Sequence, residues 1–115
     1  MKKLIFALIL AAIGSQSYAM RNSICEQKSD QREYNQCYDL AINGGLARMK
    51  GNYNRIMASG NVPKSEKDYI PKNHQKWLKE VEKRCGNDSV CFYDNLSERN
   101  FEIERYMGKY NIAPM

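Results

Sequence analysis

Four cysteines constrain this chain more than any other feature, because 115 residues can bury only a modest hydrophobic core. They occupy positions 25, 37, 85 and 91, so each neighbouring pair is close in the sequence. An even number of cysteines in a small exported domain indicates two disulfides. Each close pair flanks a predicted turn or helix end, and we therefore expect Cys25–Cys37 and Cys85–Cys91. The other two connectivities stay open. Zinc is the weaker alternative, because C-x2–4-C knuckles are lacking and His74 is the single histidine.

The first nineteen residues predict export. Met1-Lys2-Lys3 is a charged start, positions 4–13 are apolar throughout, and Ser17-Tyr18-Ala19 places small residues at −3 and −1 of a cut after Ala19. The apolar run is too short to span a bilayer, so a membrane anchor is the less favoured alternative. Cys25 does not follow the cut directly, which argues against a lipoprotein. We expect a signal peptide over 1–19 and a soluble periplasmic or secreted domain over 20–115.

The rest of the chain predicts an all-α domain of about three helices. Asp30 followed by Glu33 resembles a capping box at the start of a long helix that ends near Ala58. Gly44-Gly45 in its middle predicts either a kink or a close approach of another helix. Two shorter helices split at Gly44 are the alternative. The apolar stripe of this helix contains Tyr34, Cys37, Tyr38, Ala41, Gly45, Met49, Tyr53 and Ile56.

The second and third helices have clear end signals. Residues 60–71 read as a connector, and Pro71 suits the first position of a helix that runs to about Arg84 before Gly86 stops it. Asp88 or Ser89 caps the third helix, which ends near position 108 and leaves a loose tail over 109–115. Its predicted core face contains Phe92, Leu96, Ile103 and Met107.

Several motifs resemble the LprI-type lysozyme-inhibitor domain family. The segment His74-Gln75-Lys76-Trp77-Leu78 fits the family's Q-x-W-[LI] motif, and Cys85 follows its glutamine at the family's spacing. Cys91 and Leu96-Ser97-Glu98-Arg99 resemble the cysteine and Leu-[ST]-x-x-R stretch that come next. More loosely, the remaining two cysteines match the family's N-terminal pair, and the segment from Met49 to Tyr53 resembles its Leu-Asn-x-x-Tyr stretch. The resemblance covers about residues 25–107.

The resemblance implies an exported helical domain with disulfides and, for one branch of the family, inhibition of lysozyme. It implies mainly structural roles for six motif residues: Gln75, Trp77, Leu78, Arg84, Leu96 and Arg99. The chain departs from the family in two places. It lacks the lipid-attachment cysteine of the lipoprotein members. The family's Leu-Asn position and the small-Asp pair before it are altered, with Gly45-Leu46 there instead.

The sequence predicts a protein that is not an enzyme and that needs no cofactor or metal. His74 as a catalytic base would need a nucleophile or carboxylate that the sequence does not place beside it. The carboxylates of the second and third helices lie among lysines and arginines, as on a solvated face. Three of them form the candidate interface: Glu80, Glu98 and Glu102.

The net charge limits the classes of partner that this protein can bind. The formal net charge is +5, and it falls to +3 once the predicted signal peptide with its two lysines is cleaved off. That excess is mild and dispersed, which argues against nucleic acid. Animal-type lysozymes are strongly basic, so inhibition would need a local acidic patch such as those three glutamates, or a more acidic target. We expect a periplasmic protein that occludes a cell-wall hydrolase such as lysozyme. The alternative is an accessory envelope protein, or an immunity protein with a cognate toxin.

Overall fold

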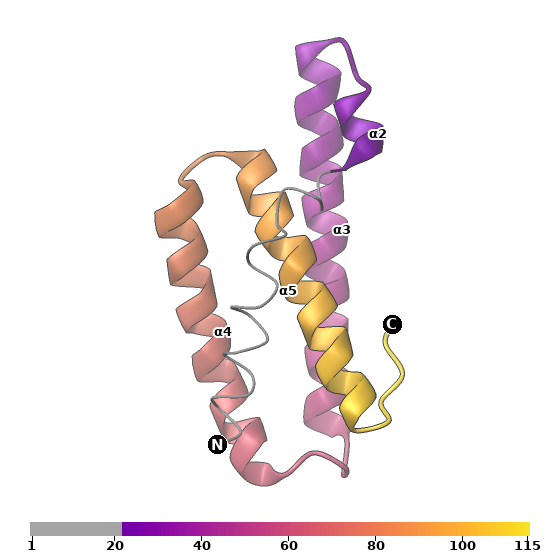
Figure 1. Cartoon of the computed structure of the whole chain (residues 1–115), viewed down its shortest axis with the longest axis vertical. Coiled ribbons are helices and arrows are strands. Elements are labelled where there is room, and N and C mark those ends of the chain that lie inside the picture. The colour runs from indigo at the N-terminus through magenta and orange to yellow at the C-terminus, as the bar shows by residue number, and fades with distance from the viewer. Residues whose placement is uncertain (1–21) are drawn as a thin grey trace.

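The computed structural model describes residues 22–115, and within that range the chain is helical without a strand (Figure 1). The helices are α2 (Ser23–Glu26), α3 (Gln31–Ala58), α4 (Lys64–Cys85) and α5 (Ser89–Lys109). The last of them packs against both α3 and α4, while α2 packs on α3. The predicted all-α class is confirmed. The predicted signal peptide lies outside the described residues, and no helix among those residues is long and apolar enough to cross a membrane.

Both predicted disulfides are present. Cys25 joins α2 to the second turn of α3, with Cα atoms 5.4 Å apart. Cys85 at the end of α4 joins Cys91 in the first turn of α5, with Cα atoms 5.5 Å apart. Each bond closes a short loop, and each is expected to stabilise the fold by about 2–3 kcal/mol. The close pairing in sequence therefore predicted the covalent framework correctly.

The long helix α3 begins after its predicted cap at Asp30 and is continuous. The Asp30 side chain accepts a hydrogen bond from the Glu33 backbone nitrogen at 3.3 Å, and the helix ends at Ala58. It runs unbroken through Gly44-Gly45, so the alternative of two shorter helices is wrong. Of the two alternatives predicted for the glycine pair, the structure shows the close approach: Gly45 lies against Leu96 of α5.

The start of α4 corrects the sequence prediction. The helix begins at Lys64 rather than at Pro71, and the connector shrinks to residues 59–63. The Pro63 carbonyl accepts the backbone nitrogens of Glu66 and Lys67, both at 3.1 Å. Pro71 is interior and removes one backbone donor from the ladder. The helix persists because its opposite face is buried on both sides of the proline, through Glu66, Ile70, Asn73, Trp77, Val81 and Cys85.

The ends of α4 and α5 follow their signals. Gly86 has a φ of 56°, a left-handed value that suits glycine and ends α4. Asp88 caps α5 by accepting from the Cys91 backbone nitrogen at 3.1 Å. The tail, however, is docked rather than loose. The Ala113 carbonyl accepts from Arg55 at 3.1 Å, and the Met115 backbone nitrogen donates to Asn52 at 2.9 Å.

The hydrophobic core lies where the three long helices meet. Phe92 is partly buried against it, and the other three residues of the predicted α5 face are fully buried. The core consists of Met49, Ile56, Val62, Ile70, Trp77, Val81, Cys85, Leu96, Ile103, Tyr106 and Met107. Six of these eleven residues are Ile, Leu or Val, and the other five have aromatic or sulfur side chains.

Candidate functional site

The strongest candidate for a binding surface is one end of the molecule, residues 22–40, which we call the α2–α3 tip. It comprises α2, the turn after it and the first ten residues of α3. In Figure 1 this end of α3, with α2 beside it, projects beyond the turn that joins α4 and α5. The Cys25–Cys37 disulfide joins its two helical segments. The tip is therefore a protruding element with a covalent staple.

Hydrogen bonds inside the tip reinforce that staple. The Glu26 carboxylate accepts the hydroxyl of Tyr34 at 2.9 Å and also the hydroxyl of Tyr38. Tyr38 is fully buried, and its ring packs edge-on against Tyr93 of α5 at a centroid distance of 5.5 Å. Burial and the hydrogen bond to Glu26 raise the pKa of Tyr38 above its usual value. These contacts hold the tip in one geometry and anchor it to the helix bundle.

The outer surface of the tip combines apolar and acidic side chains. Ile24 is 66% exposed and Leu40 is 72% exposed, so each presents a large aliphatic side chain to solvent. Four exposed carboxylates belong to the tip: Glu26, Asp30, Glu33 and Asp39. Only Lys28 and Arg32 oppose them, so the tip has a net charge of −2 in a chain of +5. The tip is thus a local acidic surface with apolar side chains exposed in it.

A second candidate is a polar cluster inside the bundle, centred on Arg99. Its side chain is fully buried, and its guanidinium donates to the Tyr53 hydroxyl at 3.1 and 3.3 Å and to the side-chain amide oxygen Oδ1 of Asn73. The guanidinium carbon lies 5.5 Å from the centroid of the Trp77 ring, a cation–π distance. One cation thereby joins α3, α4 and α5. This arrangement is typical of a structural role, which the motif resemblance implies for Arg99.

The predicted acidic interface does not form as a unit. Glu80 is exposed on α4, but Glu98 is 6% exposed and Glu102 is 2% exposed. The prediction of a solvated face is therefore wrong for the two α5 carboxylates, because they lie on the side of α5 that flanks the buried Arg99. The pKa of Glu102 is raised to about 8, mainly by burial; the Arg99 charge opposes this shift and the Glu98 charge adds to it.

His74 lies beside the same cluster, between two aromatic rings. The imidazole stacks on Trp77 at 5.9 Å between centroids and meets Tyr53 edge-on at 5.1 Å. Burial and the neighbouring Arg99 charge lower the pKa of His74, so the ring is neutral at neutral pH. Its Nδ1 atom makes no hydrogen bond. The surroundings of His74 are those of a packed, half-buried helix residue.

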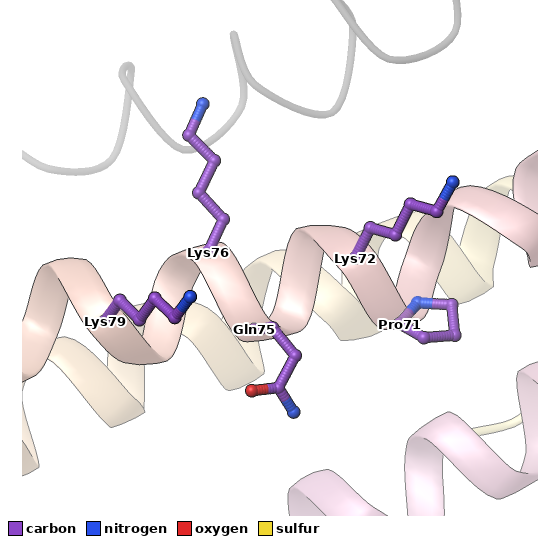
Figure 2. A pocket seen from close by; sticks show the side chains of 5 residues that line it. All are labelled: Pro71, Lys72, Gln75, Lys76 and Lys79. Carbon is purple, nitrogen blue, oxygen red and sulfur yellow. The ribbon is translucent and has the colours of Figure 1, made fainter.

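The other motif residues are divided between core and surface. Trp77 and Leu96 are core residues, and Leu78 packs against the core. Arg84 is exposed and donates to the Asn95 side chain at 2.5 Å. Gln75 is exposed as well, and it lines a shallow depression with Pro71 and three lysines of α4 (Figure 2).

Sequence reasoning missed both the tip and the acceptors of Arg99. The tip had a readable signal, because Leu40 falls outside the apolar stripe of α3 and four carboxylates lie within residues 22–40. Tyr53 and Asn73 had none, since their partner is far away in the chain. Within residues 22–115 we find no group of three or more His, Cys, Asp or Glu side chains that could hold a metal ion.

No family model, curated protein or solved structure matches this chain. The features that bear on function are therefore those of the chain itself: a stapled, protruding, acidic tip with exposed apolar side chains, and a bundle whose buried arginine connects three helices.

Proposed function

We propose that this protein is an exported, non-enzymatic binding domain that occludes a cell-wall hydrolase, and that the α2–α3 tip is the part that docks. A lysozyme is the first target to test, because the motifs around Trp77 and Arg99 resemble those of LprI-type inhibitors. The observation that carries the proposal is the exposure of Ile24 and Leu40 on a stapled, acidic projection.

The chemistry of the tip suits a basic partner. Exposed carboxylates attract a cationic surface and raise the association rate, whereas buried apolar anchors supply most of the affinity once the surfaces meet. The tip offers both, with Glu33 and Asp39 on the same helix as Leu40. The acidic patch that a basic lysozyme requires is thus assigned to the tip rather than to Glu98 and Glu102.

Rigidity and size also favour docking by the tip. Its disulfide and the two tyrosine hydrogen bonds to Glu26 order it before binding, so little conformational entropy is lost on association. A typical interface uses about 20–30 residues on each side. The tip supplies nineteen, and neighbouring positions of α3 and α5 can complete such an area.

The test is inhibition of peptidoglycan hydrolysis by protein produced from the full-length chain. Leu40→Ala removes the most exposed aliphatic anchor and should weaken inhibition about ten-fold or more if Leu40 is a hot spot. Met57→Ala is the matched control, because Met57 is exposed on α3 outside the tip, and its effect should stay within about two-fold. Glu33→Lys should slow association, most strongly at low salt.

Two results would overturn the proposal. Absence of inhibition with several classes of lysozyme at micromolar excess would remove the hydrolase target, and equal losses for Leu40→Ala and Met57→Ala would remove the tip. Capture of an endogenous envelope protein would then favour the accessory role. Export is tested separately by sequencing the N-terminus of the purified protein, which should begin at Met20.

A further inference from the structure

The solvent side of α4 carries a line of lysines: Lys72, Lys76, Lys79 and Lys83. Spacings of four, three and four residues keep them within about 60° of one another on a helix with 3.6 residues per turn. All are exposed, and they lie opposite the buried Ile70, Trp77 and Val81. The line extends for about 16 Å along the helix. We call it the lysine face.

These four ammonium groups have no ion pair in the part of the chain that the structure describes, where Lys64 pairs with Asp68 and Arg48 pairs with Glu104. Figure 2 shows the Lys72 and Lys76 side chains extending away from the α4 ribbon. Three members of the face line the shallow depression of about 510 Å³ with Pro71 and Gln75. The exposed carboxylates of Glu80 and Glu82 lie to either side of the row, so the lysine face is a narrow strip of positive charge with an acidic group on each flank.

We propose that the lysine face is a docking surface for an anionic phospholipid bilayer. The four lysines form a straight row along one helix, and the depression that three of them line is shallow, so a flat partner can contact all four ammonium groups at once. Lysine is a flexible point charge and suits a fluid array of phosphates, whereas fixed bidentate recognition would favour arginine. The face contains no aromatic ring on which the bases of a single-stranded nucleic acid could stack.

The contact would be peripheral and electrostatic. No described helix is long and apolar enough to cross a membrane, and the lysine face has no large apolar side chain to insert. Each lysine near an anionic surface raises the partition coefficient about five-fold. The face lies on α4 whereas the tip is built from α2 and α3, so this inference is independent of the proposed hydrolase target.

Co-sedimentation with vesicles tests the proposal, using protein from the full-length chain at low ionic strength. One set of vesicles mixes zwitterionic and anionic phospholipid, and the other is purely zwitterionic. We expect binding only to the first, and we expect a loss of about 25-fold for Lys76→Gln/Lys79→Gln. The control Lys28→Gln/Lys50→Gln has the same net charge but leaves the lysine face intact, and its loss should stay within a few-fold. Circular dichroism checks that both variants keep their helices.

Three outcomes would overturn the proposal. Equal losses in the two double variants would show that net charge alone matters. Absence of binding to anionic vesicles would exclude the bilayer. Tight binding of inorganic polyphosphate through the lysine face, without binding to vesicles, would assign the face to a soluble polyanion. Lysozyme inhibition by Lys76→Gln/Lys79→Gln should be unchanged, which separates this test from that of the tip.

Discussion

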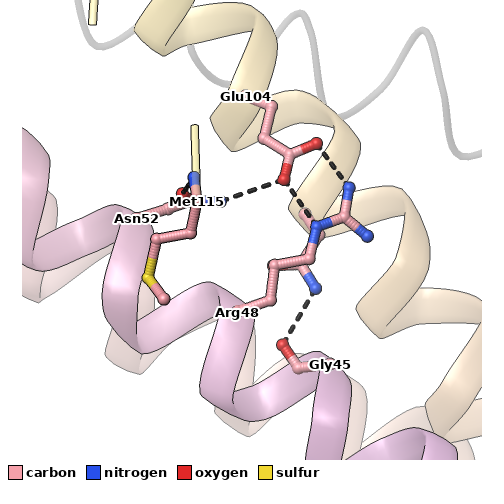
Figure 3. A network of polar contacts seen from close by, with 6 residues as sticks. Gly45, Arg48, Asn52, Glu104 and Met115 are labelled. Atoms are coloured by element: carbon pink, nitrogen blue, oxygen red, sulfur yellow. Dashed lines mark hydrogen bonds and ion pairs between the residues drawn. The ribbon is translucent and has the colours of Figure 1, made fainter. Parts of the chain in front are cut away.

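Gly45 and Leu96 meet at a point where α3 and α5 are too close for any larger residue on α3. A Cβ atom placed on Gly45 would lie 2.6 Å from Leu96 Cδ2, and Leu96 is fully buried. One turn further along α5, the Asn100 side-chain nitrogen donates to the Gly45 carbonyl at 3.0 Å (Figure 3). The glycine thus permits both a close apolar contact and an interhelical hydrogen bond.

This contact predicts that Gly45→Ala destabilises the protein. The added methyl must displace Leu96 or separate the helices, and overpacking of this kind costs about 1–3 kcal/mol. The gain in helix propensity, about 0.5–1 kcal/mol, offsets only part of that cost. Urea unfolding should show a lower midpoint for the variant with an unchanged m-value.

Gly44→Ala is the matched control, because a Cβ atom at that position meets no atom within 4 Å. It should raise the free energy of unfolding by about 0.5–1 kcal/mol through helix propensity alone. If the two variants had equal stabilities, the contact with Leu96 would not be the reason for the glycine.

The same two glycines show how much of the fold could be predicted from the sequence. A glycine pair inside an apolar stripe predicts a kink or a close approach, but the choice depends on a residue fifty-one positions away. Helix ends that depend on neighbouring residues were predicted correctly, as at the caps Asp30 and Asp88 and at Gly86, where α4 ends. Pro71 misled because its preference for a helix start is only a local preference, and burial of the opposite face of α4 outweighed it.

The burial of polar side chains could not be predicted from the sequence, for a related reason. A helix pattern assigns charged side chains to solvent, yet Arg99, Glu98 and Glu102 are buried. Whether a charge can be buried depends on partners from other elements, here Tyr53 and Asn73. The tip lies between these cases, since the cysteine spacing predicted its staple but not its projection beyond α5.

Glu102 predicts a pH dependence of stability. Its pKa rises from 4.5 to about 8 in the folded protein, so unfolding releases a proton between those values. The free energy of unfolding should therefore fall as pH rises from about 4.5 to about 8, by on the order of a few kcal/mol. Glu102→Gln should remove this dependence and become more stable than the parent at neutral pH.

Urea unfolding across that pH range measures the effect as the difference between parent and variant. Glu80→Gln serves as the control, because it makes the same substitution at an exposed carboxylate on α4. If Glu102→Gln followed the parent curve at every pH, Glu102 would titrate alike in the folded and unfolded chains.

We expect the protein to lose stability at alkaline pH, because Glu66 is hydrogen-bonded to Tyr106 of α5 and to Tyr110, the residue that follows α5. The buried Glu66 carboxylate accepts the Tyr106 hydroxyl at 2.6 Å and the Tyr110 hydroxyl at 2.8 Å. Burial and these bonds raise the pKa of Tyr110 to about 12 and that of Tyr106 as well. Since the unfolded tyrosines titrate near 10, stability should be complete below that pH and be lost as pH rises through the higher folded pKa values.

The measurement is tyrosinate absorbance followed together with helicity during an alkaline titration. Tyr106→Phe should lower the free energy of unfolding at neutral pH by about 1.5–3 kcal/mol, the range for a hydrogen bond to a charged group. It should also make the alkaline loss shallower, since one perturbed hydroxyl is gone. Parent-like stability for the variant would mean that this bond contributes little.

The two disulfides predict separable effects on stability and binding. Replacing Cys25 and Cys37 together by alanine should cost about 2–3 kcal/mol and release α2 from α3. The core has no contribution from the tip cysteines, so α3, α4 and α5 should stay helical while inhibition of the hydrolase is lost. The Cys85–Cys91 disulfide lies outside the tip. Replacing both of its cysteines by alanine should cost about 2 kcal/mol, and inhibition should stay intact at temperatures where the protein remains folded. Inhibition constants and urea midpoints for both variants decide the matter, and equal losses of inhibition at equal helicity would contradict a docking role for the stapled tip.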